Sequence, residues 1–117
     1  MPIFEVLRNE STALTFRAGE TIFSEGERGD TMFAVLDGEV EIRKHGHVLE
    51  TVAHGGVFGE MALIDDAPRS ADAIAKTDCR VVAIGEKRFM TLVQQTPFFA
   101  LQLMQVLSDR IRRNTAS

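Results

Sequence analysis

The chain has 117 residues, of which 44% are hydrophobic and 26% charged, the composition of one soluble globular domain that needs no disulfide or structural metal. Its 13 basic and 17 acidic residues give a formal net charge of −4, the wrong sign for a protein that holds a nucleic acid over a broad surface. A local site for a small anion is compatible with this charge.

The sequence gives no sign of a membrane or secreted protein. It has no run of about 18 apolar residues that would predict a membrane-spanning helix. Its first residues, MPIFE, lack the charged and then apolar pattern of a targeting segment. The single cysteine, Cys79, has no internal disulfide partner, so a reducing compartment is the simplest location. We therefore expect a cytoplasmic protein in which Cys79 is a buried or half-buried structural thiol.

Residues from about 12 to 85 form short runs separated by glycines, a rhythm typical of an antiparallel β fold. The clearest strand covers residues 39–43, where Val40 and Ile42 share one face and charges share the other. Gly46 is expected to supply the positive φ of a hairpin tip at residues 45–47. Together with runs at 31–36, 48–52, 70–77 and 80–84, these features predict about eight strands in a jelly-roll-like barrel.

Beyond Gly85 the apolar spacing becomes helical and predicts two terminal helices over about 86–113, separated at Pro97. The second helix carries an unusually broad apolar stripe, consisting of Phe99, Ala100, Leu103, Met104, Val106, Leu107 and Ile111. Its width leaves two interpretations open, a helix packed firmly on its own domain and a helix whose second edge is buried by a partner in a homodimer. The whole chain, 1–117, is expected to be a single domain.

Three arginines crowd the end of the second helix, at positions 110, 112 and 113. A solvated helix end, where cations are favoured by the helix dipole, explains them at least as well as contact with a phosphate backbone.

The segment FGEMALIDDAPRSA, residues 58–71, carries the chemistry. After Gly55 and Gly56 the backbone is free to turn, and a short helix is expected to start at Glu60, with its first amides pointing outward as a cradle for an anion. Pro68 then fixes the position of Arg69. On these residues alone Arg69 has a simpler alternative, a salt bridge to Asp66 or Asp72.

This string closely resembles the phosphate-binding segment of cyclic nucleotide-binding domains, a family that includes the catabolite activator protein, protein kinase A regulatory subunits and cyclic-nucleotide-gated channels. The resemblance extends to FRAGETIFSEGERGD at 16–30 and FAVLDGEV at 33–40, so it covers nearly the whole chain. It implies a mainly β domain with C-terminal helices that binds a cyclic nucleotide as a ligand, without a cofactor or metal and without enzymatic activity.

The resemblance also implies a role for each matching residue. Arg69 would pair with the cyclic phosphate, together with Ser70 and the backbone amides around Met61 and Ala62. Glu60, with Gly59 nearby, would accept a hydrogen bond from the ribose 2′-hydroxyl. The base pocket would be formed by Ile42, Leu49, Asn114 and Thr115. Ser70 leaves both cyclic AMP and cyclic GMP open, and cyclic AMP is favoured.

Other functions are less compatible with the sequence. His45, His47 and Glu50 loosely resemble the metal motif of cupins, but one residue is missing from the spacing and no histidine after His54 completes a site. A scaffold domain of the same fold without a ligand is disfavoured by the presence of Gly59, Glu60 and Arg69. DNA-binding relatives carry a helix-turn-helix module after the long helix, whereas this chain stops at Ser117, which leaves a stand-alone sensor and a fragment both open. The resemblance implies that the ligand repositions the terminal helices and so acts on a second copy or an effector protein.

Overall fold

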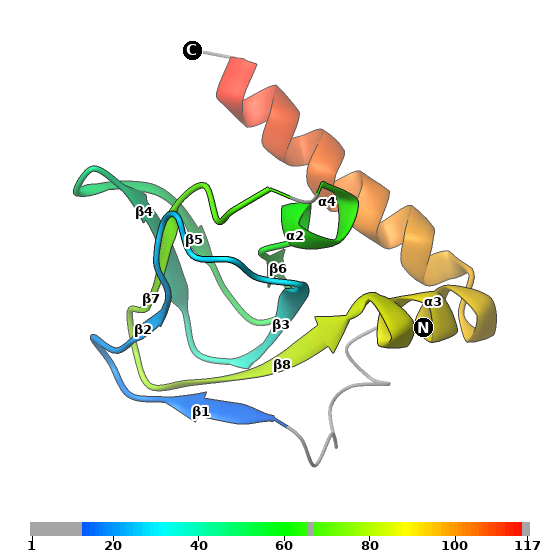
Figure 1. Ribbon diagram of the computed structural model, residues 1–117, viewed down its shortest axis with the longest axis horizontal. Coiled ribbons are helices and arrows are strands. Elements are labelled where there is room, and N and C mark those ends of the chain that lie inside the picture. The colour runs from blue at the N-terminus through cyan, green and yellow to red at the C-terminus, as the bar shows by residue number, and fades with distance from the viewer. Residues whose placement is uncertain (1–12, 66, 116–117) are drawn as a thin grey trace.

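The computed structural model describes residues 13–65 and 67–115, which form eight strands in two sheets and three helices (Figure 1). The strands are β1 (Leu14–Phe16), β2 (Thr21–Phe23), β3 (Thr31–Asp37), β4 (Val40–Lys44), β5 (His47–Val52), β6 (Val57–Phe58), β7 (Asp72–Ala75) and β8 (Cys79–Gly85). The helices are α2 (Met61–Ile64), α3 (Glu86–Gln95) and α4 (Phe98–Thr115). The predicted fold of antiparallel strands with terminal helices is confirmed, and α4 extends to Thr115 rather than 113.

Each sheet has four strands, in the orders β1-β8-β3-β6 and β2-β7-β4-β5, and all pairs are antiparallel. Strand β3 is buried from Met32 to Leu36 without a break, because both of its faces are covered. Phe33 and Val35 pack between the sheets, whereas Met32, Ala34 and Leu36 pack on the helical side. This continuous apolar run is typical of a strand inside two layers, and it places Phe33 beneath the site described below.

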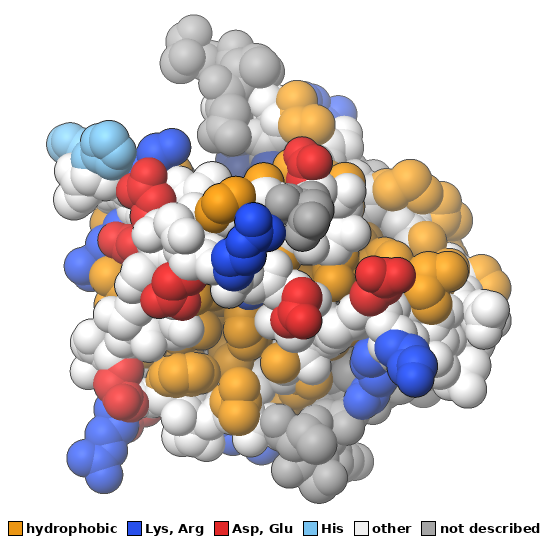
Figure 2. All heavy atoms as spheres, viewed as in Figure 1, with side chains coloured by type: hydrophobic (Ala, Val, Ile, Leu, Met, Phe, Trp, Pro, Cys, Tyr) orange, Lys and Arg blue, Asp and Glu red, His pale blue; other side chains and the backbone are white. Residues whose placement is uncertain are grey.

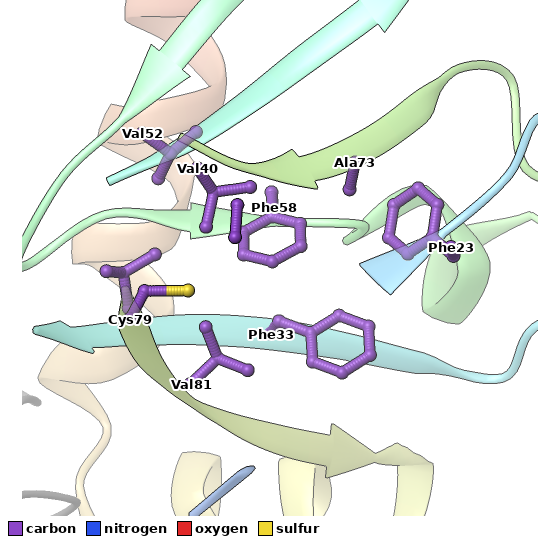
Figure 3. Packing of buried hydrophobic residues seen from close by; sticks show 10 residues of the cluster. Phe23, Phe33, Val40, Val52, Phe58, Ala73, Cys79 and Val81 are labelled. Carbon is purple, nitrogen blue, oxygen red and sulfur yellow. The ribbon is translucent and has the colours of Figure 1, made fainter. Parts of the chain in front are cut away.

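The core between the sheets is aromatic at one end. Phe33 stacks on Phe58 with ring centroids 5.2 Å apart, and Phe23 lies 6.0 Å and 5.9 Å from these two rings. Figure 3 shows this cluster with Ala73 beside Phe23 and the smaller side chains of Val40, Val52, Cys79 and Val81 toward its other end. Cys79 is buried as predicted, and desolvation raises the pKa of its thiol, so this residue is a structural one.

The hairpin at residues 44–47 has the geometry that the sequence indicated. Lys44 pairs with His47, and the two residues between them both have positive φ, +54° at His45 and +81° at Gly46. Two consecutive positive φ values define a type I′ turn, which matches the twist of an antiparallel pair.

Helix α4 packs on its own domain along one edge only. Pro97 separates it from α3 as predicted, and Phe99 and Leu103 are buried against the sheet while the Phe99 ring contacts Phe89 at 5.5 Å. The side chains of Phe98, Leu101 and Met104 are each 56% exposed, and hydrophobic side chains are visible on this side of the molecule in Figure 2. Within the predicted stripe Phe99 and Leu103 are buried and Met104 and Ile111 are exposed, while Phe98 and Leu101, which the prediction did not include, add to the exposed edge. Among the described residues, no helix combines the length and apolar character needed to cross a membrane.

The packing of β3 against the helices can be tested by truncating one buried and one exposed methionine. Met32 has no exposed surface, so Met32→Ala is expected to lower the free energy of unfolding by about 2–5 kcal/mol, the usual cost of this truncation in a core. Met90 on α3 is 52% exposed, so Met90→Ala is expected to cost less than about 1 kcal/mol. Urea unfolding of both variants checks this, and equal costs would contradict the described packing.

Candidate functional site

The segment between β6 and β7 turns twice to bring Arg69 back over the barrel. Gly59 has a φ of +75°, which glycine adopts without strain, and the chain enters the single turn of α2 directly after it. The helix ends at Asp65, whose extended backbone breaks the helical pattern three residues before Pro68. The start of the helix lies within one residue of the predicted start at Glu60.

Backbone hydrogen bonds fix the position of Arg69 against the loop after β2. Its amide donates to the carbonyl of Glu27, and its own carbonyl accepts from the amide of Gly26, both at 2.8 Å. Two glycines make room for its side chain. A Cβ at Gly29 would overlap the guanidinium, and a Cβ at Gly59 would lie 2.9 Å from its Nη1. The sequence indicated turn roles for these glycines but not this close approach.

The guanidinium of Arg69 is buried, with the residue only 8% exposed, yet its partners are neutral. Nη1 donates to the carbonyl of Gly59 at 3.1 Å, and Nη2 donates to the carbonyl of Thr31 at 2.9 Å. Its central carbon lies 4.1 Å from the ring centroid of Phe23, a favourable cation–π distance. These contacts hold the group in place without neutralising its charge.

The alternative salt bridge for Arg69 is not formed with any described carboxylate. Asp72, one of the two candidates, instead accepts a hydrogen bond from the amide of Glu25 at 2.7 Å, and the other, Asp66, lies outside the described residues. Desolvation lowers the pKa of Arg69 from its ordinary value, an effect that the more distant charges of Asp30 and Glu27 oppose. The direction of this shift shows that the buried cation lacks full compensation, a deficit that an anionic ligand would relieve.

A cavity of about 470 Å³ opens beside Arg69, a size typical of small-molecule sites. Its lining combines two arginines and two glutamates with apolar walls, and consists of Phe23, Ile42, Leu49, Glu50, Phe58, Gly59, Glu60, Met61, Ala62, Ala67, Pro68, Arg69, Ser70, Ala71 and Arg110. All the residues that the sequence assigned to phosphate and ribose contacts, and two of the four assigned to the base, therefore line one cavity.

The outward-pointing amides expected at the start of α2 are only partly present. The amide of Ala62 donates to the carbonyl of Gly59 at 3.3 Å, because the chain makes a tight turn before the helix begins. Ser70 is exposed at the edge of the cavity, next to the buried Arg69.

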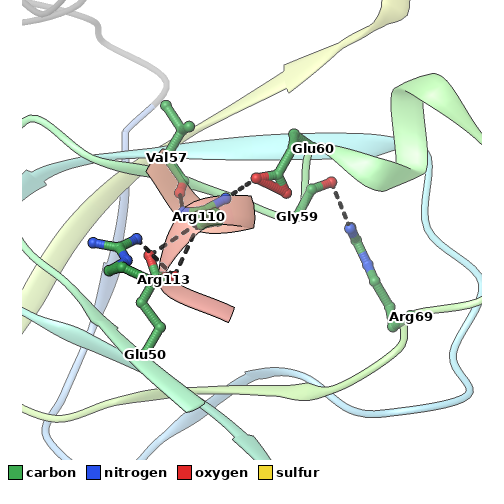
Figure 4. A network of polar contacts seen from close by, with 7 residues as sticks. All are labelled: Glu50, Val57, Gly59, Glu60, Arg69, Arg110 and Arg113. Atoms are coloured by element: carbon green, nitrogen blue, oxygen red, sulfur yellow. Dashed lines mark hydrogen bonds and ion pairs between the residues drawn. The ribbon is translucent and has the colours of Figure 1, made fainter. Parts of the chain in front are cut away.

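Arg110 of α4 is the main site residue that sequence reasoning missed. It reaches from the helix into the cavity and pairs with the buried Glu60, while its Nε donates to both carboxylate oxygens of Glu50 at 3.0 and 3.1 Å (Figure 4). It also donates to the carbonyl of Val57. The interpretation of Arg110 as part of a solvated helix end is wrong, because its side chain is only 18% exposed. The helical spacing alone gave no signal for these contacts, since the partners lie on β5, on β6 and at the residue before α2.

The pocket wall on β4 and β5 contains an irregularity. Ile42 pairs with Glu50, whereas Arg43 pairs with Val48, so Leu49 is an extra residue in β5. Such a bulge breaks the alternation of side chains, and both Leu49 and Glu50 line the cavity. Asn114 and Thr115 belong to the last turn of α4, and their side chains lie outside the described part of the structure.

The structure offers no support for the cupin-like alternative. His45 lies 4.0 Å from Glu25, and Glu50 is engaged by arginines. Within residues 13–65 and 67–115, no group of three or more His, Cys, Asp or Glu side chains is placed to hold a metal ion.

Comparison with known proteins identifies relatives of this fold and site. The family model described as the cyclic nucleotide-binding domain matches residues 13–96. The chain is 29% identical over 112 residues to the CRP-like cAMP-activated global transcriptional regulator of Mycobacterium tuberculosis, covering 92% of this chain and 50% of that protein. It is 40% identical over 84 residues to a cAMP-dependent protein kinase regulatory subunit of Aspergillus fumigatus, covering 69% of this chain and 20% of that protein.

Solved structures agree with these matches. The crystal structure of the Thermus thermophilus catabolite activator protein has a TM-score of 0.81 to this chain at 29% identity, over 97% of this chain and 56% of that one. The chain thus spans about half the length, or less, of the relatives named here. Since the family model matches residues 13–96, more than half of the sequence, the chain belongs to the cyclic nucleotide-binding domain family.

Proposed function

We propose that the cavity beside Arg69 binds a cyclic nucleotide, with the phosphate at the guanidinium of Arg69. The observation that carries this proposal is the burial of that guanidinium against carbonyl oxygens and the Phe23 ring, with no described carboxylate at ion-pair distance. A buried cation is costly unless it has an anionic partner, and the open side of this one faces a cavity of nucleotide-compatible size.

We assign the other lining residues to three parts of the proposed ligand, which are the phosphate, the ribose and the base. Ser70, Met61 and Ala62 line the same cavity as Arg69, and Ser70 and the backbone at Met61 and Ala62 would share the phosphate. Glu60, next to Gly59, would accept a hydrogen bond from the ribose 2′-hydroxyl. Ile42 and Leu49 would pack on the base, with Asn114 and Thr115 near its edge. We favour cyclic AMP over cyclic GMP, because the relatives named above are described as cAMP-activated or cAMP-dependent.

We propose a regulatory role rather than a catalytic one, in which the nucleotide changes the placement of α4. Arg110 supports this proposal, since it connects α4 to Glu60, the residue expected to contact the ribose. A ribose hydroxyl at Glu60 would alter that ion pair and so shift the population of helix positions. The activity of any longer protein that contains this domain would then depend on the surface of α4.

Replacement of Arg69 tests the phosphate site. Arg69→Gln removes the charge at nearly constant size, and the loss of a charge-assisted contact of about 1.5–3 kcal/mol is expected to weaken cyclic AMP binding by about 10- to 150-fold. Titration calorimetry with cyclic AMP and cyclic GMP measures this. Arg80→Gln is the control, because Arg80 pairs with Asp37 on the exposed surface, outside the cavity lining. Unchanged affinity in Arg69→Gln, or no binding by the wild type, would refute the proposed site.

The ribose contact is tested by comparing cyclic AMP with its 2′-deoxy analogue. The wild type is expected to prefer the ribose ligand by about tenfold, the value of one hydrogen bond to a charged acceptor. In Glu60→Gln this preference should fall at least about threefold, because the acceptor loses its charge. Arg69→Gln should weaken both ligands and keep their ratio. An unchanged ratio in Glu60→Gln would exclude Glu60 as the ribose contact.

We further propose that the exposed edge of α4 forms a homodimer with the same edge of a second copy. Phe98, Leu101 and Met104 recur every three residues on this 18-residue helix, so two copies related by a twofold axis would bury matching side chains. An effector protein at this edge is the alternative.

Sedimentation velocity over a range of protein concentrations distinguishes the two. The wild type is expected to show a concentration-dependent dimer, and Leu101→Glu to sediment as a monomer because it would place charges in the interface. Met90→Glu, on the exposed side of α3, should behave as the wild type does. A wild type that stays monomeric at every concentration would remove the homodimer and leave the effector protein.

A further inference from the structure

Glu50 on β5 makes more contacts to α4 than its position on a strand would suggest. Its two carboxylate oxygens accept from Nε of Arg110 at 3.1 and 3.0 Å, and Oε1 also accepts from Nη2 of Arg113 at 3.2 Å. Arg110 and Arg113 lie 60 and 63 positions after Glu50 in the sequence, and their contacts with it join the barrel wall to the last turns of the helix (Figure 4). Glu50 lies opposite Ile42, which also lines the cavity, and the bulge lets the neighbouring Leu49 line it as well.

Arg110 links Glu50 to the proposed ribose site. Its guanidinium lies between two carboxylates, Glu50 on β5 and Glu60 at the start of α2, and it also donates to the carbonyl of Val57. The Arg110 and Glu60 side chains are 18% and 8% exposed, so this pair is largely shielded from water and salt. Without Arg110 the two carboxylates would both add negative charge to a cavity proposed to accept an anion.

The carboxylates of Glu50 and Glu60 differ in how many arginines hold them. A ribose hydroxyl that arrives at Glu60 must share that carboxylate with Arg110, whereas Glu50 is held by Arg110 and Arg113 together. Glu50 therefore keeps Arg110, and with it the end of α4, beside the cavity whether or not Glu60 is engaged by a ligand. Arg110 pairs with Oε1 of Glu60 in this structure, so a ribose hydroxyl gains its share of that carboxylate only when the ion pair adjusts.

We propose that Glu50 is a positioning residue that holds Arg110 and α4 over the cavity and thereby sets the rates at which a nucleotide associates and dissociates. This inference rests on the proposed function and adds a residue that acts through Arg110 rather than on the nucleotide itself. Loss of the Glu50 carboxylate weakens the closed arrangement with and without ligand, so it speeds both rates and leaves the equilibrium affinity nearly unchanged.

Stopped-flow measurements with a fluorescent cyclic AMP derivative test the rates. In Glu50→Gln, both the association and the dissociation rate are expected to rise about three- to tenfold, the effect of one partly exposed charge-assisted contact, while Kd changes less than about threefold. Glu50→Asp keeps the charge on a shorter side chain and should restore part of the wild-type rates, which a loss of packing alone would not explain. Wild-type rates in Glu50→Gln, or an affinity loss through dissociation alone, would overturn the proposal.

Glu41→Gln is the matched control. Glu41 lies on the neighbouring strand β4 and pairs with Arg43 of the same strand. The Glu41→Gln variant therefore removes a carboxylate from the same sheet, but one whose ion pair is not with α4. Its nucleotide rates are expected to equal those of the wild type. Faster exchange of nucleotide in this control as well would assign the effect to the sheet and overturn the role of Glu50.

Hydrogen exchange in the nucleotide-free protein separates this inference from the proposed function. Glu50→Gln should speed amide exchange in α4 at least about threefold, and leave β3 and β8 unchanged, because only the helix loses an anchor. Unchanged exchange in α4 would refute the positioning role even if nucleotide binds. Faster exchange in α4, together with no binding of cyclic AMP or cyclic GMP by the wild type, would support the anchoring by Glu50 and refute the nucleotide site.

Discussion

The structure depends on the placement of one buried cation, the guanidinium of Arg69. Backbone hydrogen bonds to the loop at Gly26 and Glu27 fix where the residue lies, and Gly29 leaves the space that its side chain fills. The aromatic end of the core, with Phe23 nearest, provides a rigid surface for it. These features hold a positive charge at the wall of a cavity without cancelling it, which is the arrangement that recognition of a small anion requires.

A second arginine connects that cavity to the surface of the molecule. Arg110 leaves α4 and ends between Glu50 and Glu60, so the barrel and the helix share one set of ion pairs. The same helix exposes Phe98, Leu101 and Met104 on its other edge. A change at the proposed ribose position therefore reaches an exposed apolar surface through one helix, and no longer chain of contacts is needed for the proposed regulation.

The sequence predicted local features well and long-range contacts poorly. The hairpin turn at Gly46 and the start of the short helix near Glu60 depend on backbone preferences of a few adjacent residues and agree with the structure. The position of the Arg110 side chain depends on Glu60 and Glu50, which lie 50 and 60 positions earlier in the sequence. Helical spacing therefore carried no information about it. Glu50 was missed as an anchor of α4 because strand alternation gives only the face of a side chain, and its partners Arg110 and Arg113 lie 60 and 63 positions later.

The central claim is that the buried Arg69 charge is the phosphate site of a cyclic nucleotide. A crystal structure of the protein grown with cyclic AMP tests it most directly, because it locates the phosphate, ribose and base at once. We expect phosphate oxygens within about 3 Å of the Arg69 guanidinium nitrogens and the ribose beside Glu60. A nucleotide bound with its phosphate away from Arg69, or a cavity that stays empty at saturating cyclic AMP, would contradict the claim.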